Sequence, residues 1–129
     1  MQRRTFLISA IAALASAPTL AHGSKTHSHS HDGKFGGSVV DVDNYHVELV
    51  AKNDTIDVYV RDGDDKEMPI KGFKGVAIFT LAGKAQRVPL EVVDDKRLSG
   101  KASAPLPAKL KVAVQITPPG KRAVTAKFG

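Results

Sequence analysis

Alternation of apolar and polar residues is the clearest pattern in this chain from residue 38 onward. Between residues 45 and 51 every second residue is apolar, and His46 and Glu48 fall on the opposite face. Between residues 55 and 61 the alternation repeats, with apolar residues at the even positions. Side chains alternate between the two faces of a strand, so both segments read as half-buried strands. The turn residues Lys52-Asn53-Asp54 between them predict a β-hairpin.

Further runs with strand character follow along the chain, separated by turn residues. They cover residues 38–42, 76–81, 86–93, 97–102, 110–116 and 123–128. Pro89 within one of these runs predicts an edge position, because proline cannot donate to a ladder. No helical pattern occurs after the N-terminal segment. The sequence therefore predicts an all-β fold, an immunoglobulin-like sandwich of seven or eight antiparallel strands, as one domain over residues 38–129.

The first 21 residues have the layout of an export signal. A basic start with Arg3 and Arg4 precedes an apolar run over residues 6–17, and the small residue Ala21 suits a signal peptidase. The run is shorter than the ~20 apolar residues that span a bilayer, so we expect cleavage and no stable membrane anchor. The stretch Arg3-Arg4-Thr5-Phe6-Leu7 resembles a twin-arginine signal. This route and the ordinary secretory route both lead to the periplasm of a Gram-negative bacterium.

Composition narrows the chemistry of the exported part. The 129-residue chain has no cysteine, which excludes disulfides, thiolate metal sites and cysteine nucleophiles. The formal charge is +6, but the lysines and arginines are scattered along the sequence. They are not interleaved with aromatic residues, so we expect no nucleic-acid partner. Phosphate-binding loops, nucleophile elbows and zinc-protease motifs are also missing, which favours a protein without enzymatic activity.

The segment over residues 22–37 changes to His, Ser, Gly, Lys and Thr, a composition that predicts a flexible arm. Three of its histidines alternate with serines as His27, His29 and His31, and Asp32 follows. An extended chain would turn the three imidazoles to one side, where they could converge on one ion. Neutral imidazole suits Cu(II), Zn(II) and Ni(II), and Asp32 could add a carboxylate oxygen. A solvated linker is the alternative interpretation.

A second part of a metal site is predicted on the sandwich. His46 and Glu48 lie two residues apart on the outward strand face, and Asp57 or Tyr59 could lie opposite them across the hairpin. If the arm folds back, His31 and His46 could share an ion. The alternative is an exposed polar pair without a ligand, since strands commonly alternate in this way.

The chain also resembles small periplasmic β-domain proteins that accompany heavy-metal efflux adaptors. The resemblance covers about half of the exported part and rests on three segments: Phe35-Gly36-Gly37-Ser38-Val39-Val40, Tyr45-His46-Val47-Glu48-Leu49-Val50 and Ile56-Asp57-Val58-Tyr59-Val60-Arg61-Asp62. It implies a role in metal handling without specifying the ion. Where such sequences carry a histidine just before the glycine pair, this chain has Lys34-Phe35.

A narrower resemblance concerns the new N-terminus. Cleavage after Ala21 would leave His22 first, so that its α-amine and imidazole could chelate one ion. This arrangement is similar to the copper sites of periplasmic copper-resistance chaperones, which are also small β-sandwiches.

The leading hypothesis from sequence is a periplasmic metal-binding protein that buffers Cu(II), Zn(II) or Ni(II) or delivers it to an efflux system. The arm would capture the ion and the sandwich would be the platform. An exposed edge strand could dock a periplasmic efflux adaptor or another protein by strand addition. The alternative is a protein-binding adaptor in which the histidine arm is only a linker.

Overall fold

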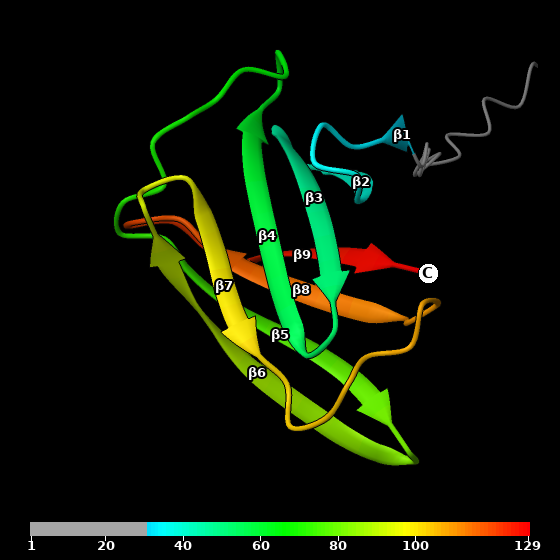
Figure 1. The fold of residues 1–129 in the computed structure, drawn as a ribbon. Helices are drawn as coiled ribbons and strands as arrows, with labels where there is room; N and C mark the ends of the chain where they lie inside the picture. Colours follow the sequence, from blue (N-terminus) through cyan, green and yellow to red (C-terminus); the bar gives the residue numbers. More distant parts are fainter. Residues whose placement is uncertain (1–30) are drawn as a thin grey trace, which may run out of the picture.

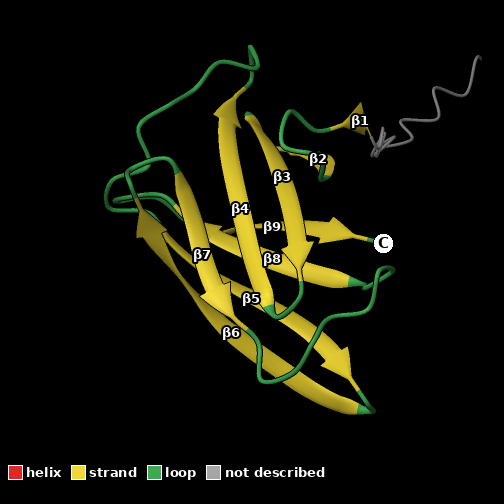
Figure 2. Ribbon diagram, viewed as in Figure 1, coloured by secondary structure: helices red, strands yellow, loops and turns green. Residues whose placement is uncertain are grey.

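The computed structural model describes residues 31–129 (Figure 1). Within them the chain forms nine strands and no helix, and so no helix that could cross a membrane (Figure 2). The strands are β1 (His31–Asp32), β2 (Ser38–Val42), β3 (Tyr45–Lys52), β4 (Thr55–Asp62), β5 (Lys74–Leu81), β6 (Lys84–Val93), β7 (Arg97–Lys101), β8 (Val112–Thr117) and β9 (Val124–Phe128). The predicted all-β fold is confirmed, and β2 to β9 correspond to the eight expected runs.

All neighbouring strands are antiparallel, in the order β1-β2-β3-β4-β7-β6-β5-β8-β9. The sheet folds over into two layers, seen in Figure 1 as β3, β4 and β7 in front of β5, β6, β8 and β9. Strand β6 joins the layers, because it pairs with β5 as far as Leu90 and with β7 from Glu91 to Val93. Strands β2 and β9 also come close to each other. The result is a sandwich that is nearly closed into a barrel.

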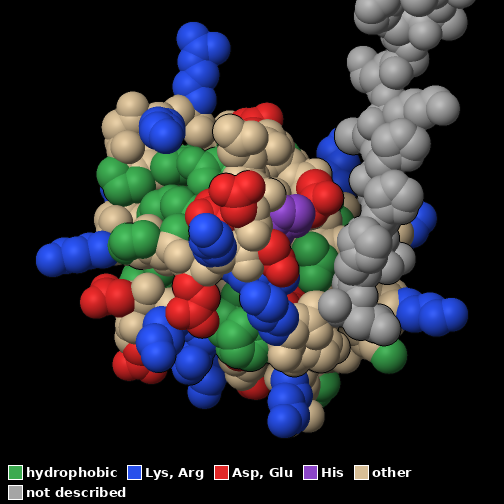
Figure 3. All heavy atoms as spheres, turned by 90° about the horizontal axis from the view of Figure 1, so that it is seen from above, with side chains coloured by type: hydrophobic (Ala, Val, Ile, Leu, Met, Phe, Trp, Pro, Cys, Tyr) green, Lys and Arg blue, Asp and Glu red, His purple; other side chains and the backbone are tan. Residues whose placement is uncertain are grey.

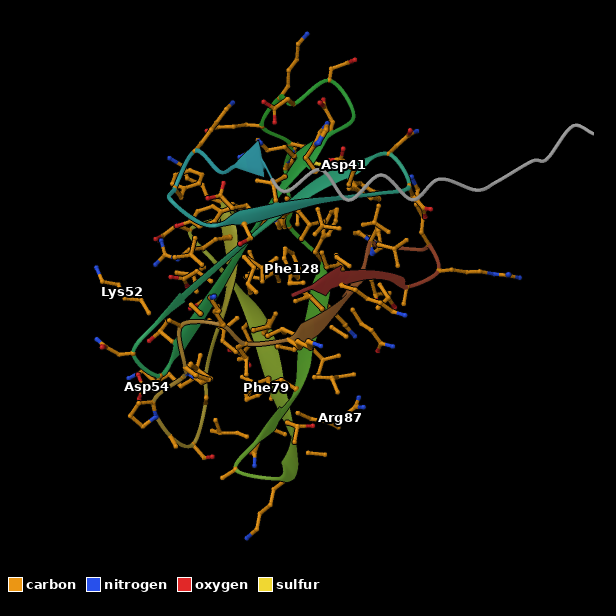
Figure 4. The ribbon with its side chains drawn as sticks, turned by 90° about the vertical axis from the view of Figure 1, so that its right-hand side faces the viewer. Asp41, Lys52, Asp54, Phe79, Arg87 and Phe128 are labelled. Atoms are coloured by element: carbon orange, nitrogen blue, oxygen red, sulfur yellow. The ribbon has the colours of Figure 1, made fainter. Side chains whose placement is uncertain are left out.

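The core follows the predicted alternation. Ile56, Val58 and Val60 of β4 are buried, and so are the alternate residues of β8. Two of the core aromatic residues, Phe79 and Phe128, lie in the interior between the layers (Figure 4). With no tryptophan in the chain, aliphatic side chains from both layers supply most of the buried apolar area that stabilises the fold.

Pro89 lies in the part of β6 that pairs only with β5, opposite Val76. Its missing N–H therefore breaks no ladder hydrogen bond with β7, whose pairing begins at Glu91. The backbone of Gly100 passes close by, since a Cβ built there would meet the Pro89 carbonyl oxygen and the Val88 side chain. The edge character expected of Pro89 is thus local, at the point where β6 passes from one layer to the other.

Acidic and basic residues are divided unevenly between two parts of the chain, which the fold places largely in different layers. Residues 31–67, which form β1 to β4 and the following loop, carry ten Asp and Glu against four Lys and Arg, a formal charge of −6. Residues 68–129 carry three Asp and Glu against twelve Lys and Arg, a formal charge of +9. The layer of β1 to β4 is therefore acidic apart from β7, which belongs to the second segment, and the layer containing β5, β8 and β9 is basic.

Candidate metal centre

The β2–β3 hairpin brings His46 and Asp41 together. Its two-residue turn is Asp43-Asn44, and Asp43 has a φ of 50°, a left-handed conformation that Asp adopts more readily than most residues. The resulting register pairs Val42 with Tyr45 and Asp41 with His46. Directly opposite residues in an antiparallel pair share one face, so the imidazole and the carboxylate lie side by side.

His46 makes contacts through both ring nitrogens. Nδ1 contacts Asp41 Oδ1, and Nε2 lies 3.2 Å from the carbonyl oxygen of Gly63. The side chain of His46 is 25% exposed and that of Asp41 is 44% exposed, so solutes can reach the pair. Figure 3 shows this end of the molecule, where histidine atoms lie among acidic and basic side chains. An imidazole nitrogen and a carboxylate oxygen are both suitable ligands for a divalent transition metal, which would replace one of the two contacts of the His46 ring on binding.

Strand β1 connects the histidine-rich arm to this hairpin. The backbone of His31 pairs with Val39 and that of Asp32 pairs with Ser38. These two predicted site residues are therefore at the edge of β2, the strand that carries Asp41. The other predicted ligands of the arm, His22, His27 and His29, lie outside the described residues.

Glu48 differs from its expected exposed position. It lies on the outward face of β3, but its side chain is fully buried because the loop over residues 33–37 covers it. Oε2 accepts hydrogen bonds from the backbone N–H groups of Phe35 at 2.8 Å and Gly37 at 3.0 Å. Oε1 accepts a bond from Nη1 of Arg61 at 3.3 Å. Both carboxylate oxygens are thus engaged in holding the loop.

The loop also ends the arm earlier than the sequence suggests. Residues 33–37, assigned to the flexible arm by composition, form a turn in which the N–H of Gly33 donates to the Gly37 carbonyl at 2.9 Å. The ring of Phe35 stacks on Tyr59 with centroids 3.8 Å apart. The hydrogen bonds to Glu48 and this stack fix the segment on the outer face of β3 and β4.

A chain of charges extends from Glu48 to the surface. Arg61, only 6% exposed, donates from Nε to Asp65 Oδ1 at 2.6 Å, and Lys34 lies 3.7 Å from the other oxygen of Asp65. The hydrogen bond from Arg61, supported by the positive charges of Arg61, Lys34 and His46, lowers the pKa of Asp65 below its ordinary value of 3.8. Asp65 is thus a carboxylate at neutral pH that helps to anchor Arg61.

The β3–β4 register decides which predicted neighbours meet. Of the two residues that the sequence offered as neighbours across the hairpin, Tyr59 lies opposite Glu48. Asp57 lies opposite Val50 instead, and its Oδ1 is 3.5 Å from Nε of Arg97 on β7. The residue opposite His46 is Arg61. Sequence reasoning missed Asp41, although the Asp43-Asn44 turn is a hairpin signal that would have paired it with His46.

Among the residues that the structure describes, no three His, Asp or Glu side chains converge on a point where they could hold a metal ion by themselves. A centre at His46 and Asp41 therefore needs a further ligand from elsewhere in the chain. In comparisons with known proteins, no family model, curated protein or solved structure matches the chain.

Proposed function

We propose that this chain is an exported periplasmic protein that binds a divalent transition metal, Cu(II), Zn(II) or Ni(II), between its histidine-rich arm and the β2–β3 hairpin. The observation that carries the proposal is the pairing of His31 with Val39. It joins a segment with alternating histidines to the same strand that holds Asp41 next to His46.

The register supports a specific geometry for the bound state. Strands β1 and β2 are antiparallel, so each step back from His31 advances one residue along β2 from Val39. If residues 29 and 30 pair with β2 in the same register when the ion is bound, His29 comes level with Asp41, which is itself level with His46. Residues level with each other share one face of the sheet, so the two imidazoles and the carboxylate would form a row of three ligands.

The charge distribution favours a cation at this place. The segment over residues 31–67 has a formal charge of −6, which raises the local concentration of cations. A preformed His46–Asp41 pair also lowers the entropy cost of binding, since two of the proposed ligands already lie side by side. Both effects strengthen binding beyond that of a histidine tract alone.

The biological role that fits is buffering of the ion or its delivery to an efflux system. The three segments that resemble efflux-associated β-domains support this role, and they include His46 and its strand. The protein would then act without catalysis, by holding an ion and releasing it.

Calorimetric titration with Zn(II), Cu(II) and Ni(II) tests the proposal on the processed, tag-free protein, with its N-terminus read by mass spectrometry. We expect stoichiometric, submicromolar binding of at least one ion. The variant His27→Ala/His29→Ala/His31→Ala should lose it. The variant His46→Ala should bind at least roughly tenfold to a hundredfold more weakly, since loss of a group that only supports a metal ligand already costs that much.

Asp43→Asn is the matched control, because Asp43 is an exposed acid in the same hairpin that the proposal leaves out of the site. It should bind as the wild type does. Weak, unsaturable binding by the wild-type protein would reject metal binding as its function. Tight binding that is indifferent to His46→Ala would confine the site to the arm and remove the sandwich from it.

A further inference from the structure

The basic layer carries a groove that the proposed metal centre does not use. Its volume is about 750 Å³, and it runs between the end of β9 and the segment over residues 107–112. Ile78 of β5 and Ala113 of β8 are among its lining residues, and the register places them side by side. The groove therefore has small apolar side chains on the outer face of the sheet.

Lysines border these apolar residues. Lys109, Lys111 and Lys127 all line the groove and are exposed. Lys127 is level with Ala113 on β9, and Arg87 is level with Ile78 on β6. Figure 4 shows Arg87 on the outside of the sheet. The four side chains that lie level with one another across β6, β5, β8 and β9 are thus cationic, apolar, apolar and cationic.

None of these four cations has an acidic partner within residues 31–129, where the ion pairs involve Lys34, His46, Arg61 and Arg97 only. The segment over residues 98–129 has six Lys and Arg and no Asp or Glu at all. Cations gathered at one hollow without internal counterions are complementary to an acidic binding partner.

We propose that this groove binds an extended acidic segment of a partner protein, with its carboxylates at the lysine rim and small apolar side chains on Ile78 and Ala113. An extended chain points alternate side chains to opposite sides, which suits a narrow apolar floor with charged borders.

A protein segment fits the groove better than a bilayer surface does. Phe35 is the large apolar side chain that is exposed within the described residues, and it lies on the acidic layer, stacked on Tyr59. The basic face thus presents no bulky apolar group for insertion into lipid. A hollow with borders also suits an inserted chain more than a flat sheet of headgroups.

Fluorescence anisotropy with a dye-labelled acetyl-(Glu-Val)4-amide peptide tests the proposal, using the processed full chain in buffer with chelator so that metal binding plays no part. We expect saturable binding that weakens as salt is raised. The variant Lys109→Glu/Lys111→Glu/Lys127→Glu should bind roughly tenfold more weakly or worse, because it reverses the rim. The milder triple replacement by Gln takes its place if circular dichroism shows that the Glu variant is unfolded.

The control variant Lys71→Glu/Lys121→Glu/Arg122→Glu changes the net charge equally on exposed residues outside the groove. It should retain binding within about threefold. Equal loss in both variants would assign the binding to overall charge and overturn the groove. So would absence of binding by the wild type at low salt. Wild-type binding to phosphatidylglycerol vesicles without binding to the peptide would replace the protein partner by a membrane.

Discussion

Replacing Glu48 by alanine should remove the group that holds the loop over residues 33–37 on the sandwich. The substitution deprives the N–H groups of Phe35 and Gly37 of their acceptor. It also leaves the guanidinium of Arg61, which is 6% exposed, without one of its two anionic partners. The loop that connects the sandwich to β1 and the arm should loosen as a result.

The cost follows from these lost contacts. Removing one partner of a buried ion pair costs about 3–5 kcal/mol. Arg61 keeps its ion pair with Asp65, which places the cost at the lower end of this range. The two N–H groups that lose their acceptor add to the cost, but water that enters the loop replaces part of the lost hydrogen bonding. We expect a loss of about 3 kcal/mol for Glu48→Ala, a large share of the roughly 5–15 kcal/mol that stabilises a typical domain. Glu48→Gln keeps one oxygen but sets an amide against Arg61, and should cost about 1–2 kcal/mol.

Urea unfolding followed by far-ultraviolet circular dichroism measures these losses. Hydrogen exchange of the Phe35 and Gly37 amides in the variants should show faster opening than in the wild type. Glu91→Ala is the control, since Glu91 is an exposed acid on β6 and should change stability by no more than about 0.5 kcal/mol. A loss below about 1 kcal/mol for Glu48→Ala, with exchange of both amides unchanged, would refute the assignment of Glu48 as the anchor of the loop.

Three further predictions concern the same loop and its surroundings. Phe35→Ala removes the stack on Tyr59 and should lower stability by about 0.5–1.5 kcal/mol in urea unfolding, whereas an unchanged midpoint would show the stack to be unimportant. The pKa of Asp65 in the folded state lies below its ordinary value of 3.8, so its contribution to stability is complete above that value and is lost as the pH falls below it. Asp65→Asn should therefore reduce the loss of stability at acidic pH in a curve of stability against pH. An identical acidic part of the curve in wild type and variant would contradict this. Gly37→Ala would drive a Cβ into the carbonyl oxygen of Leu49 and should destabilise the protein by more than about 1 kcal/mol. A melting temperature equal to that of the wild type would contradict this.

Most of the fold was predictable because its signals are local. The alternation over residues 45–51 and 55–61 and the turn between them specify a hairpin, and β3 and β4 form it with Lys52 paired to Thr55. The order of the strands in the sheet was not predictable in this way. The passage of β6 from one layer to the other depends on packing between distant segments, and Pro89 gives only an ambiguous hint of it.

The site was predictable in part, for a similar reason. His46 stands out by residue type, and it does face outward on β3. The burial of Glu48 could not be read from strand alternation, because it results from a loop that lies on the face of the sheet and supplies two backbone donors. The uneven charge of residues 31–67 and 68–129 can be counted in the sequence, but their placement in two layers, with β7 as the exception, depends on the fold.

The most direct test of the account is histidine-ring NMR of the processed protein during titration with Zn(II) up to one equivalent. The ring signals of His46 and of at least one arm histidine should shift together and stop changing at one equivalent. Asp41→Asn should weaken the response at His46. Shifts confined to the arm, with the ring of His46 unchanged throughout, would contradict the claim that the hairpin and the arm share one metal ion.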